Sequence, residues 1–204
     1  MGNTRMIIYR GTDGNEQLMK EGASFFQKRS EVRFGDHEVE INKFFWEAFE
    51  LGSYGLRPFF TDPSKKYIIT GHSLGGALAS ILALRTTQLF GGSAWKNPKS
   101  SLITFGQPRV GDAAYAELHD SLISTYRKLR FVNKADLVTK LPPRSLGYRH
   151  HSRAVYMGQE KIPKKGWWFF GMNHEIQDGV LITIKKKMKK KMKLYWTKMQ
   201  SCSH

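Results

Sequence analysis

The residues of this chain best suited to chemistry lie in the stretch YIITGHSLGGALAS, residues 67–80. Within it, GHSLG at residues 71–75 is a Gly-x-Ser-x-Gly pattern, which is typical of a serine held on a sharp turn between a strand and a helix. A serine hydroxyl is a weak nucleophile alone, so it needs a base, an acid that orients the base, and donors for the oxyanion. The pattern therefore predicts a nucleophilic Ser73, and any of the seven histidines could in principle be its base.

The sequence on either side of Ser73 predicts the two elements that would position it. The apolar run KYIIT reads as a strand that ends at Thr70, and SLGGALASILALRTTQLF reads as a helix that begins with small residues. Gly71, Gly75 and Gly76 suit this turn, because the helix must pass close to neighbouring strands where a Cβ atom would clash. The sequence therefore predicts a strand–turn–helix elbow with Ser73 at its apex.

Strands and helices are expected to alternate along the rest of the chain. The expected strands are a buried one at residues 6–9 and others at 101–106, 128–133 and 153–157, and the expected helices cover 37–60 and 111–124, the latter capped near Asp112. A short helix and loop are expected at residues 16–29. This alternation predicts an α/β fold with a mainly parallel sheet and helices on both faces.

Composition predicts one globular domain followed by a different kind of segment. The 204 residues are 40% apolar, and the net charge is +16. Residues 158–204 carry eleven Lys and three acidic residues, and seven of the nine residues 185–193 are Lys. We therefore expect a domain at 1–157 and an atypical Lys-rich tail at 158–204. The single Cys202 cannot form an intrachain disulfide, and scattered histidines predict neither a metal site nor a cofactor.

No segment of the chain predicts a membrane span or an export signal. The first residues lack the apolar run of a signal peptide, and no stretch approaches the roughly 20 apolar residues of a spanning helix. The chain as it stands is therefore expected to be cytoplasmic. No phosphate-binding loop or nucleic-acid motif accompanies the bulk positive charge, so no nucleic-acid partner is expected.

Four motifs occur in a fixed order: YRGT, TGHSLGGALAS, TFGQPRVGD and NKADLVTKLPPR. Together they resemble the class 3 lipases, the fungal-lipase-type branch of the α/β-hydrolases, and the resemblance covers about residues 6–157. It implies a serine hydrolase that cleaves acylglycerols or related lipid esters, without a cofactor. Relatives in this family are often secreted, which conflicts with the cytoplasmic expectation.

The resemblance also implies site residues. The acid of the family lies just ahead of a Leu-Pro-Pro sequence, and that position is Asp136 here. At the carboxyl end of a parallel strand, a carboxylate faces the crevice where doubly wound sheets bind ligands. The backbone N–H of Leu74 is one expected oxyanion donor, and the residue after Arg-Gly, Thr12, is the second.

The base is the part of the site that the resemblance does not supply. The family's Asp-His-x-x-Tyr-like sequence, which carries the base after the acid, is missing from this chain. By order and loop-like setting, His174 is the first candidate, with His150, His151 and the terminal His204 behind it. A chain with no working base is an equally open alternative.

Both ends of the chain depart from the family. Strands expected ahead of the Arg-Gly-Thr turn are missing, and the region after residue 12, where the family has a lid, is short and only modestly apolar. The tail combines GWWFF with KKKMKKKMK, which would suit peripheral contact with a lipid interface, although a plain solvated tail is the simpler interpretation. The alternative function is therefore a truncated, catalytically impaired hydrolase remnant that at most binds lipid.

Overall fold

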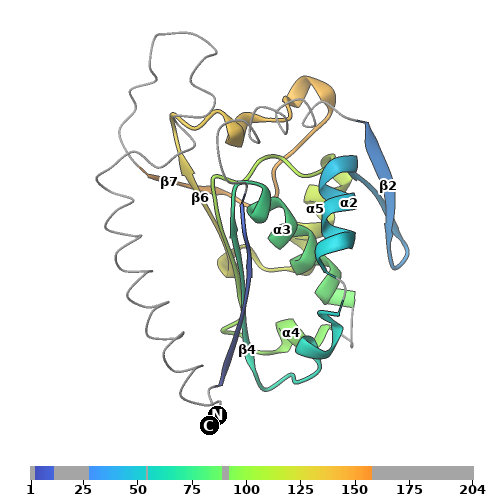
Figure 1. Ribbon diagram of the computed structural model, residues 1–204, viewed down its shortest axis with the longest axis vertical. Coiled ribbons are helices and arrows are strands. Elements are labelled where there is room, and N and C mark those ends of the chain that lie inside the picture. Colours follow the sequence, from blue (N-terminus) through green and yellow to red (C-terminus); the bar gives the residue numbers. More distant parts are fainter. Residues whose placement is uncertain (1–2, 12–27, 54, 89–91, 158–204) are drawn as a thin grey trace. The chain divides into compact units, whose positions relative to one another are not determined.

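The computed structural model of the chain describes residues 3–11, 28–53, 55–88 and 92–157 (Figure 1). These residues belong to one compact unit that spans Met1–His174, and a second unit, Glu175–His204, lies outside the described residues. The expected division into a domain at 1–157 and a tail at 158–204 therefore stays a prediction.

A five-stranded parallel sheet forms the centre of the fold. Its strand order is β1-β4-β5-β6-β7, and every neighbouring pair is parallel. The strands are β1 (Thr4–Tyr9), β4 (Lys66–His72), β5 (Ser101–Phe105), β6 (Lys128–Asn133) and β7 (Ala154–Met157). Each of these strands was expected from the sequence, and the α/β fold class with its parallel sheet is confirmed.

The expected helix at 37–60 is wrong for its first part. His37–Asn42 is strand β3, which pairs antiparallel with β2 (Arg29–Phe34) in a hairpin. Val39 and Ile41 are buried on one face of β3, so the period of two outweighed the helical spacing of the same apolar residues. Lys43–Gly52 is α-helical, as α2, where the Asn42 side chain caps Phe44 and Phe45. Arg57–Phe60 at the end of the expected range is a short 3₁₀ helix.

The helix α3 (Leu74–Gln88) is the centre of the packing. Eleven of its fifteen residues are buried, ten of them in the unbroken run 75–84, as expected for a helix enclosed on all sides. It contacts β1, β4 and β5 of the sheet as well as α2, α4 (Ser93–Lys96) and α5 (Ala113–Leu122). In Figure 1 α2, α3, α4 and α5 stand on one side of the central sheet, whereas helices on both faces were expected; that part of the expectation is not met among the described residues. The expected cap of α5 at Asp112 is confirmed, because the Asp112 side chain accepts from the Tyr115 N–H.

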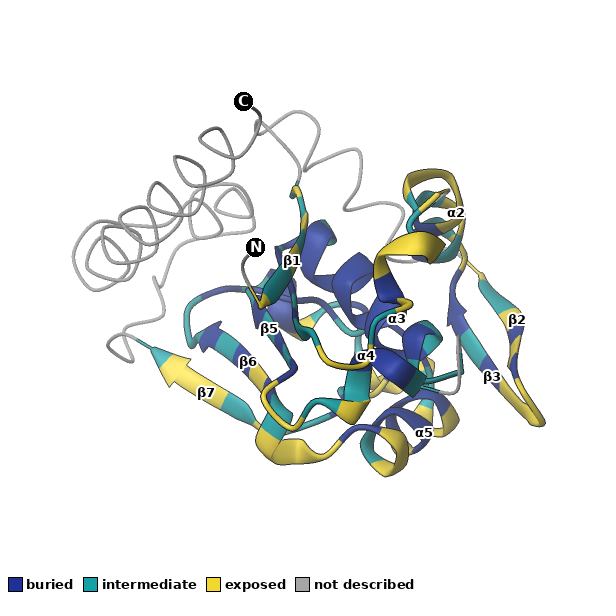
Figure 2. Ribbon diagram, turned by 90° about the horizontal axis from the view of Figure 1, so that it is seen from below, coloured by how far each residue is buried: buried dark blue, intermediate teal, exposed yellow. Residues whose placement is uncertain are grey.

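The first strand differs from its expected setting. β1 was expected to be buried, but it lies at the edge of the sheet, and Ile8 is 52% exposed. Figure 2 shows the same contrast, with buried residues gathered around α3 and exposed ones at the outer elements. Among the described residues, no helix is both long and apolar enough to cross a membrane.

Candidate active site

Ser73 lies where the sequence pattern predicted it, between the last residue of β4 and the first residue of α3. Its φ angle is 57°, in the left-handed region that residues other than glycine seldom adopt. The Ser73 N–H donates to the Phe105 carbonyl (2.9 Å), and the Ser73 carbonyl accepts from the Gly76 N–H (2.9 Å). These bonds tie the strained turn to β5 on one side and to the helix on the other.

The glycines around Ser73 are required by close backbone contacts. A Cβ atom on Gly71 would lie 2.1 Å from the Gly75 carbonyl oxygen, and one on Gly75 would lie 2.4 Å from the Tyr9 carbonyl oxygen. Real Cβ atoms do not approach oxygen so closely, so β1, β4 and the start of α3 can pack this tightly only with glycine at both positions.

Asp136 follows the end of β6, at the same carboxyl edge of the sheet as Ser73, with β5 between their strands. Two strand spacings of about 4.8 Å put the strand ends roughly 10 Å apart, which leaves room for one imidazole between the two side chains. Asp136 is only 4% exposed, and its Oδ1 accepts from the Val138 N–H (2.9 Å). This bond holds the carboxylate in place at the start of the loop.

The structure describes one of the two expected oxyanion donors, Leu74, but not the other, Thr12. Leu74 is the first residue of α3, so its N–H is one of the helix-start donors that lack an intrahelical partner. Such N–H groups, at the positive end of the helix dipole, favour a negative oxygen nearby. Thr12 and the region expected to hold a lid lie outside the described residues.

The candidate bases divide into described and undescribed residues. His174 and His204 lie outside the described residues. Among the described residues, no hydrogen bond joins an imidazole to Ser73. His150 instead donates from Nε2 to the Thr139 carbonyl (2.7 Å), and His151 is buried in a polar network beneath α3.

The other described histidines are also placed elsewhere. His37 is exposed in the β2–β3 hairpin, and the ring of His72 lies beside Gly11, where a Cβ atom would be 3.4 Å from its Nδ1. His119 is fully buried in α5, with its ring stacked on that of His151 (3.8 Å between centroids).

The polar network around His119 and His151 was not expected from the sequence. The Ser80 hydroxyl lies 2.6 Å from the Tyr115 hydroxyl and 2.8 Å from His151 Nε2, which also accepts from the Gln107 amide (3.0 Å). His151 Nδ1–H then donates to the Ser152 hydroxyl (3.1 Å). Tyr115 and His119, four residues apart on the buried side of α5, were its only signal in the sequence.

The network holds neutral imidazoles. Burial, reinforced by the Lys128 ammonium, lowers the pKa of His119 to about 3, and burial lowers the pKa of His151 well below its usual range. His119, Asp120 and His151 have ligand atoms within 4.8 Å of one another. However, the Lys128 ammonium already donates to the Asp120 carboxylate, so a metal ion bound there would compete with a cation of the protein itself.

Three comparisons place these features among known proteins. A family model described as lipase (class 3) matches residues 6–146. A lipase of Rhizomucor miehei is 40% identical over 117 residues, which cover 55% of this chain and 31% of that protein. The crystal structure of a lipase from Rhizopus microsporus var. chinensis has a TM-score of 0.62 and 25% identity, over 77% of this chain and 54% of that one.

A further relative bears on location and substrate. Secreted mono- and diacylglycerol lipase 1 of Fusarium solani is 36% identical over 103 residues, which cover 50% of this chain and 28% of that protein. Its name describes a secreted enzyme, so the comparisons do not support the expected cytoplasmic location. The chain spans about a third of the length of the curated relatives it matches.

Proposed function

The chain belongs to the class 3 lipase family, and from that premise we propose that it is a serine carboxylic-ester hydrolase of acylglycerols or related lipid esters. Ser73 attacks the ester carbonyl, and the N–H of Leu74 with Thr12 stabilises the oxyanion. His174 transfers the proton, and Asp136 orients the imidazole. The alcohol leaves, and water then cleaves the acyl-enzyme by the same route.

The observation that carries this proposal is the backbone of Ser73. A non-glycine residue with φ of 57° costs about 1–3 kcal/mol, a cost that persists only when the surroundings impose the conformation. Here two glycines that accept no Cβ atom allow β1, β4 and α3 to meet at this turn. The strain has a use in a hydrolase, because it presents the hydroxyl at the carboxyl edge of the sheet beside a helix N-terminus.

Asp136 adds independent support for the proposed roles. A buried carboxylate that accepts a backbone N–H is held in one orientation, as an acid that positions an imidazole requires. Its place after β6 matches the crevice at the carboxyl ends of parallel strands where such folds bind ligands.

A second function, a non-catalytic member of the family that binds lipid, is favoured by one observation. No described hydrogen bond links any of the five described histidines to Ser73, and His119, His150 and His151 are bonded to other groups. The enzyme therefore depends on a histidine outside the described residues, and of His174 and His204 the first candidate is His174. Loss of the base alone can cost as much as loss of a whole triad, about 10⁶-fold in turnover.

Labelling of the full chain with a fluorophosphonate, beside hydrolysis of short p-nitrophenyl esters, separates the two functions. We expect wild type to be labelled and active, Ser73→Ala to be neither, and His174→Ala to be labelled far more slowly. His204→Ala is the matched control, and it should behave as wild type.

Two results would overturn parts of the proposal. Ester hydrolysis that survives in Ser73→Ala would show that Ser73 is not the nucleophile. Equal labelling of wild type and His174→Ala would remove His174 as the base, and an unlabelled wild type that still binds lipid would establish the second function.

A further inference from the structure

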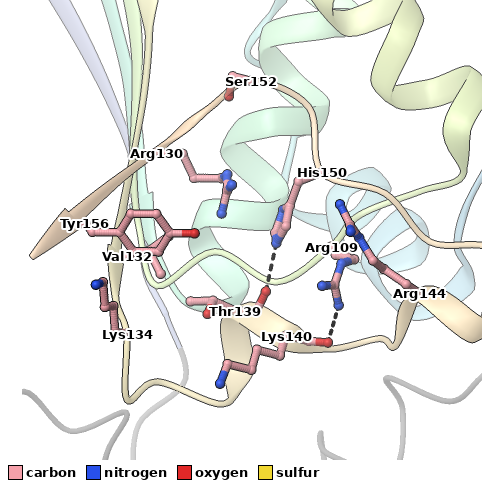
Figure 3. A pocket seen from close by; sticks show the side chains of 10 residues that line it. All are labelled: Arg109, Arg130, Val132, Lys134, Thr139, Lys140, Arg144, His150, Ser152 and Tyr156. Atoms are coloured by element: carbon pink, nitrogen blue, oxygen red, sulfur yellow. Dashed lines mark hydrogen bonds between the residues drawn. The ribbon is translucent and has the colours of Figure 1, made fainter. Parts of the chain in front are cut away.

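A cavity of about 750 Å³ lies against β6 and β7, bounded on its other side by the segment 139–150 (Figure 3). Its volume falls within the range of about 300–1,000 Å³ that is usual for small-molecule sites. Val132 and Tyr156, which are partners in the register of β6 and β7, form part of its wall. The walls of the cavity are therefore formed largely by β6, by β7 and by the segment 139–150 between them in the chain.

The described lining of this cavity is strongly basic. Five cationic side chains line it, and none of the described lining residues is acidic: the cations are Arg109, Arg130, Lys134, Lys140 and Arg144. Lys140 and Arg144 are exposed, whereas Arg130 is only 7% exposed. Charges of one sign in a concave site raise the local concentration of the opposite ion.

Arg130 is the lining residue whose buried charge has the least compensation from the described residues. Its Nε is buried and has no hydrogen-bond partner among the described residues. A buried guanidinium without a carboxylate is costly, and guanidinium groups in proteins are normally paired when buried. In Figure 3 the guanidinium of Arg130 points into the space between Tyr156 and His150.

Two further buried atoms in the lining also lack a partner among the described residues. Arg109 donates from Nη1 to the Lys140 and Pro142 carbonyls, but its Nε makes no bond. His150 donates from Nε2 to Thr139, which leaves its buried Nδ1 without a partner. Thus three residues that line one cavity each keep a buried nitrogen unused, although buried polar atoms are rarely left unpaired.

We propose that this cavity binds a phosphate-type oxyanion, either free phosphate or the phosphate of a lipid headgroup, with Arg130 as its principal ligand. A guanidinium fork matches two phosphate oxygens at once, and such charge-assisted bonds are the strong ones. Lys140 and Arg144 attract the anion from solvent. Burial and the neighbouring Arg130 lower the pKa of His150 to about 3, so its neutral Nδ1 accepts a hydrogen bond from a P–OH group of the bound phosphate. The site does not depend on Ser73 or on ester hydrolysis.

The register of β6 and β7 identifies a position at which a substitution would block the proposed anion site. Ala154 is the partner of Arg130 in the parallel pairing of β6 and β7, so their side chains point to the same face of the sheet. A carboxylate introduced by Ala154→Glu would pair with Arg130 and take the place of the anion. Arg130→Gln removes the cation itself, and Arg153→Gln, which removes an exposed charge outside the lining, is the matched control.

The test measures the binding of inorganic phosphate to the full chain at constant ionic strength. Calorimetry gives the affinity, and thermal unfolding gives the change in Tm. We expect phosphate to bind and to raise the Tm of wild type and Arg153→Gln. We expect Arg130→Gln and Ala154→Glu to bind at least about tenfold more weakly, the effect of losing one charge-assisted bond. Ala154→Glu should also be more stable than wild type without phosphate.

A second arm identifies the source of the phosphate. Vesicles of phosphatidylcholine with phosphatidic acid are compared with vesicles in which phosphatidylserine supplies the same net charge. Stronger binding to phosphatidic acid that is lost in Arg130→Gln and kept in Arg153→Gln indicates a lipid headgroup, and its absence with retained phosphate binding indicates a free phosphate. Equal phosphate affinity in wild type and Arg130→Gln, or no phosphate binding to wild type, would overturn the proposal.

Discussion

At the scale of single residues, Asp136 has two separable tasks. Its Oδ1 accepts the Val138 N–H, which shapes the loop after β6, and its Thr139 neighbour returns a bond from its hydroxyl to the Asp136 carbonyl (2.8 Å). The proposed chemistry requires the negative charge, whereas an uncharged amide oxygen could accept the same N–H.

Asp136→Asn should therefore separate folding from turnover. The asparagine oxygen keeps the Val138 bond, so the Tm should stay close to that of wild type. Ester hydrolysis should fall about 10³–10⁴-fold, because the imidazole loses the charge that stabilises its protonated form. Asp136→Ala is the comparison, and it should lose both activity and stability. Full activity in Asp136→Asn would exclude Asp136 as the orienting acid.

At the scale of secondary-structure elements, the elbow is held together by backbone contacts across glycine. Gly75 faces the carbonyls of Tyr9 and Arg10, so the N-terminal turn of α3 rests directly on the end of β1. This contact is closer than any side chain permits, and it joins an edge strand to the helix that carries the candidate oxyanion donor.

Gly75→Ala should destabilise the fold by at least about 2 kcal/mol, because the new Cβ atom overlaps backbone rather than a side chain that can rotate away. Gly52→Ala is the matched control, since its Cβ atom would meet only the Tyr9 ring, at 3.9 Å. That variant, at the exposed end of α2, should be neutral or slightly stabilised by the better helix propensity of alanine. Chemical denaturation of the three proteins measures both effects, and equal stability of wild type and Gly75→Ala would contradict the contact.

At the scale of the whole molecule, the buried network links folding to pH. His119 and His151 are neutral in the folded chain, while in the unfolded chain histidine has its ordinary pKa of about 6.5. Between that pH and about 3, the unfolded chain binds more protons at His119 than the folded chain does. The contribution of these neutral histidines to the free energy of unfolding is therefore fully present above about pH 6.5, and it decreases as the pH falls below that value.

We expect each such histidine to contribute a slope of up to about 1.4 kcal/mol per pH unit below pH 6. His119→Gln should be less stable than wild type at pH 7 but should have a shallower pH dependence, because the group that titrates on unfolding is gone. His37→Gln, changed in the exposed hairpin, should keep the slope of wild type. Unfolding curves between pH 7 and 4.5 test this, and an unchanged slope in His119→Gln would contradict it.

The local sequence was sufficient for the elbow and for the positions of the five parallel strands along the chain. Ser73 could be placed because a glycine-spaced turn between an apolar strand and a small-residue helix has few other conformations. The cap at Asp112 was readable for a similar reason, since it depends on residues close together in the chain. These features are all decided within a few residues of each other.

Tertiary structure decided what depends on contacts between distant segments. Residues 37–42 became a strand because Arg29–Phe34 pairs with them, and no property of the six residues alone reveals that partner. The burial of His119 and His151 follows from the packing of α5 and the loop before β7 beneath α3, which sets their charge state. The Arg130 Nε, which is buried and has no partner among the described residues, likewise became visible only once the β6–β7 register placed alanine, rather than an acid, beside Arg130.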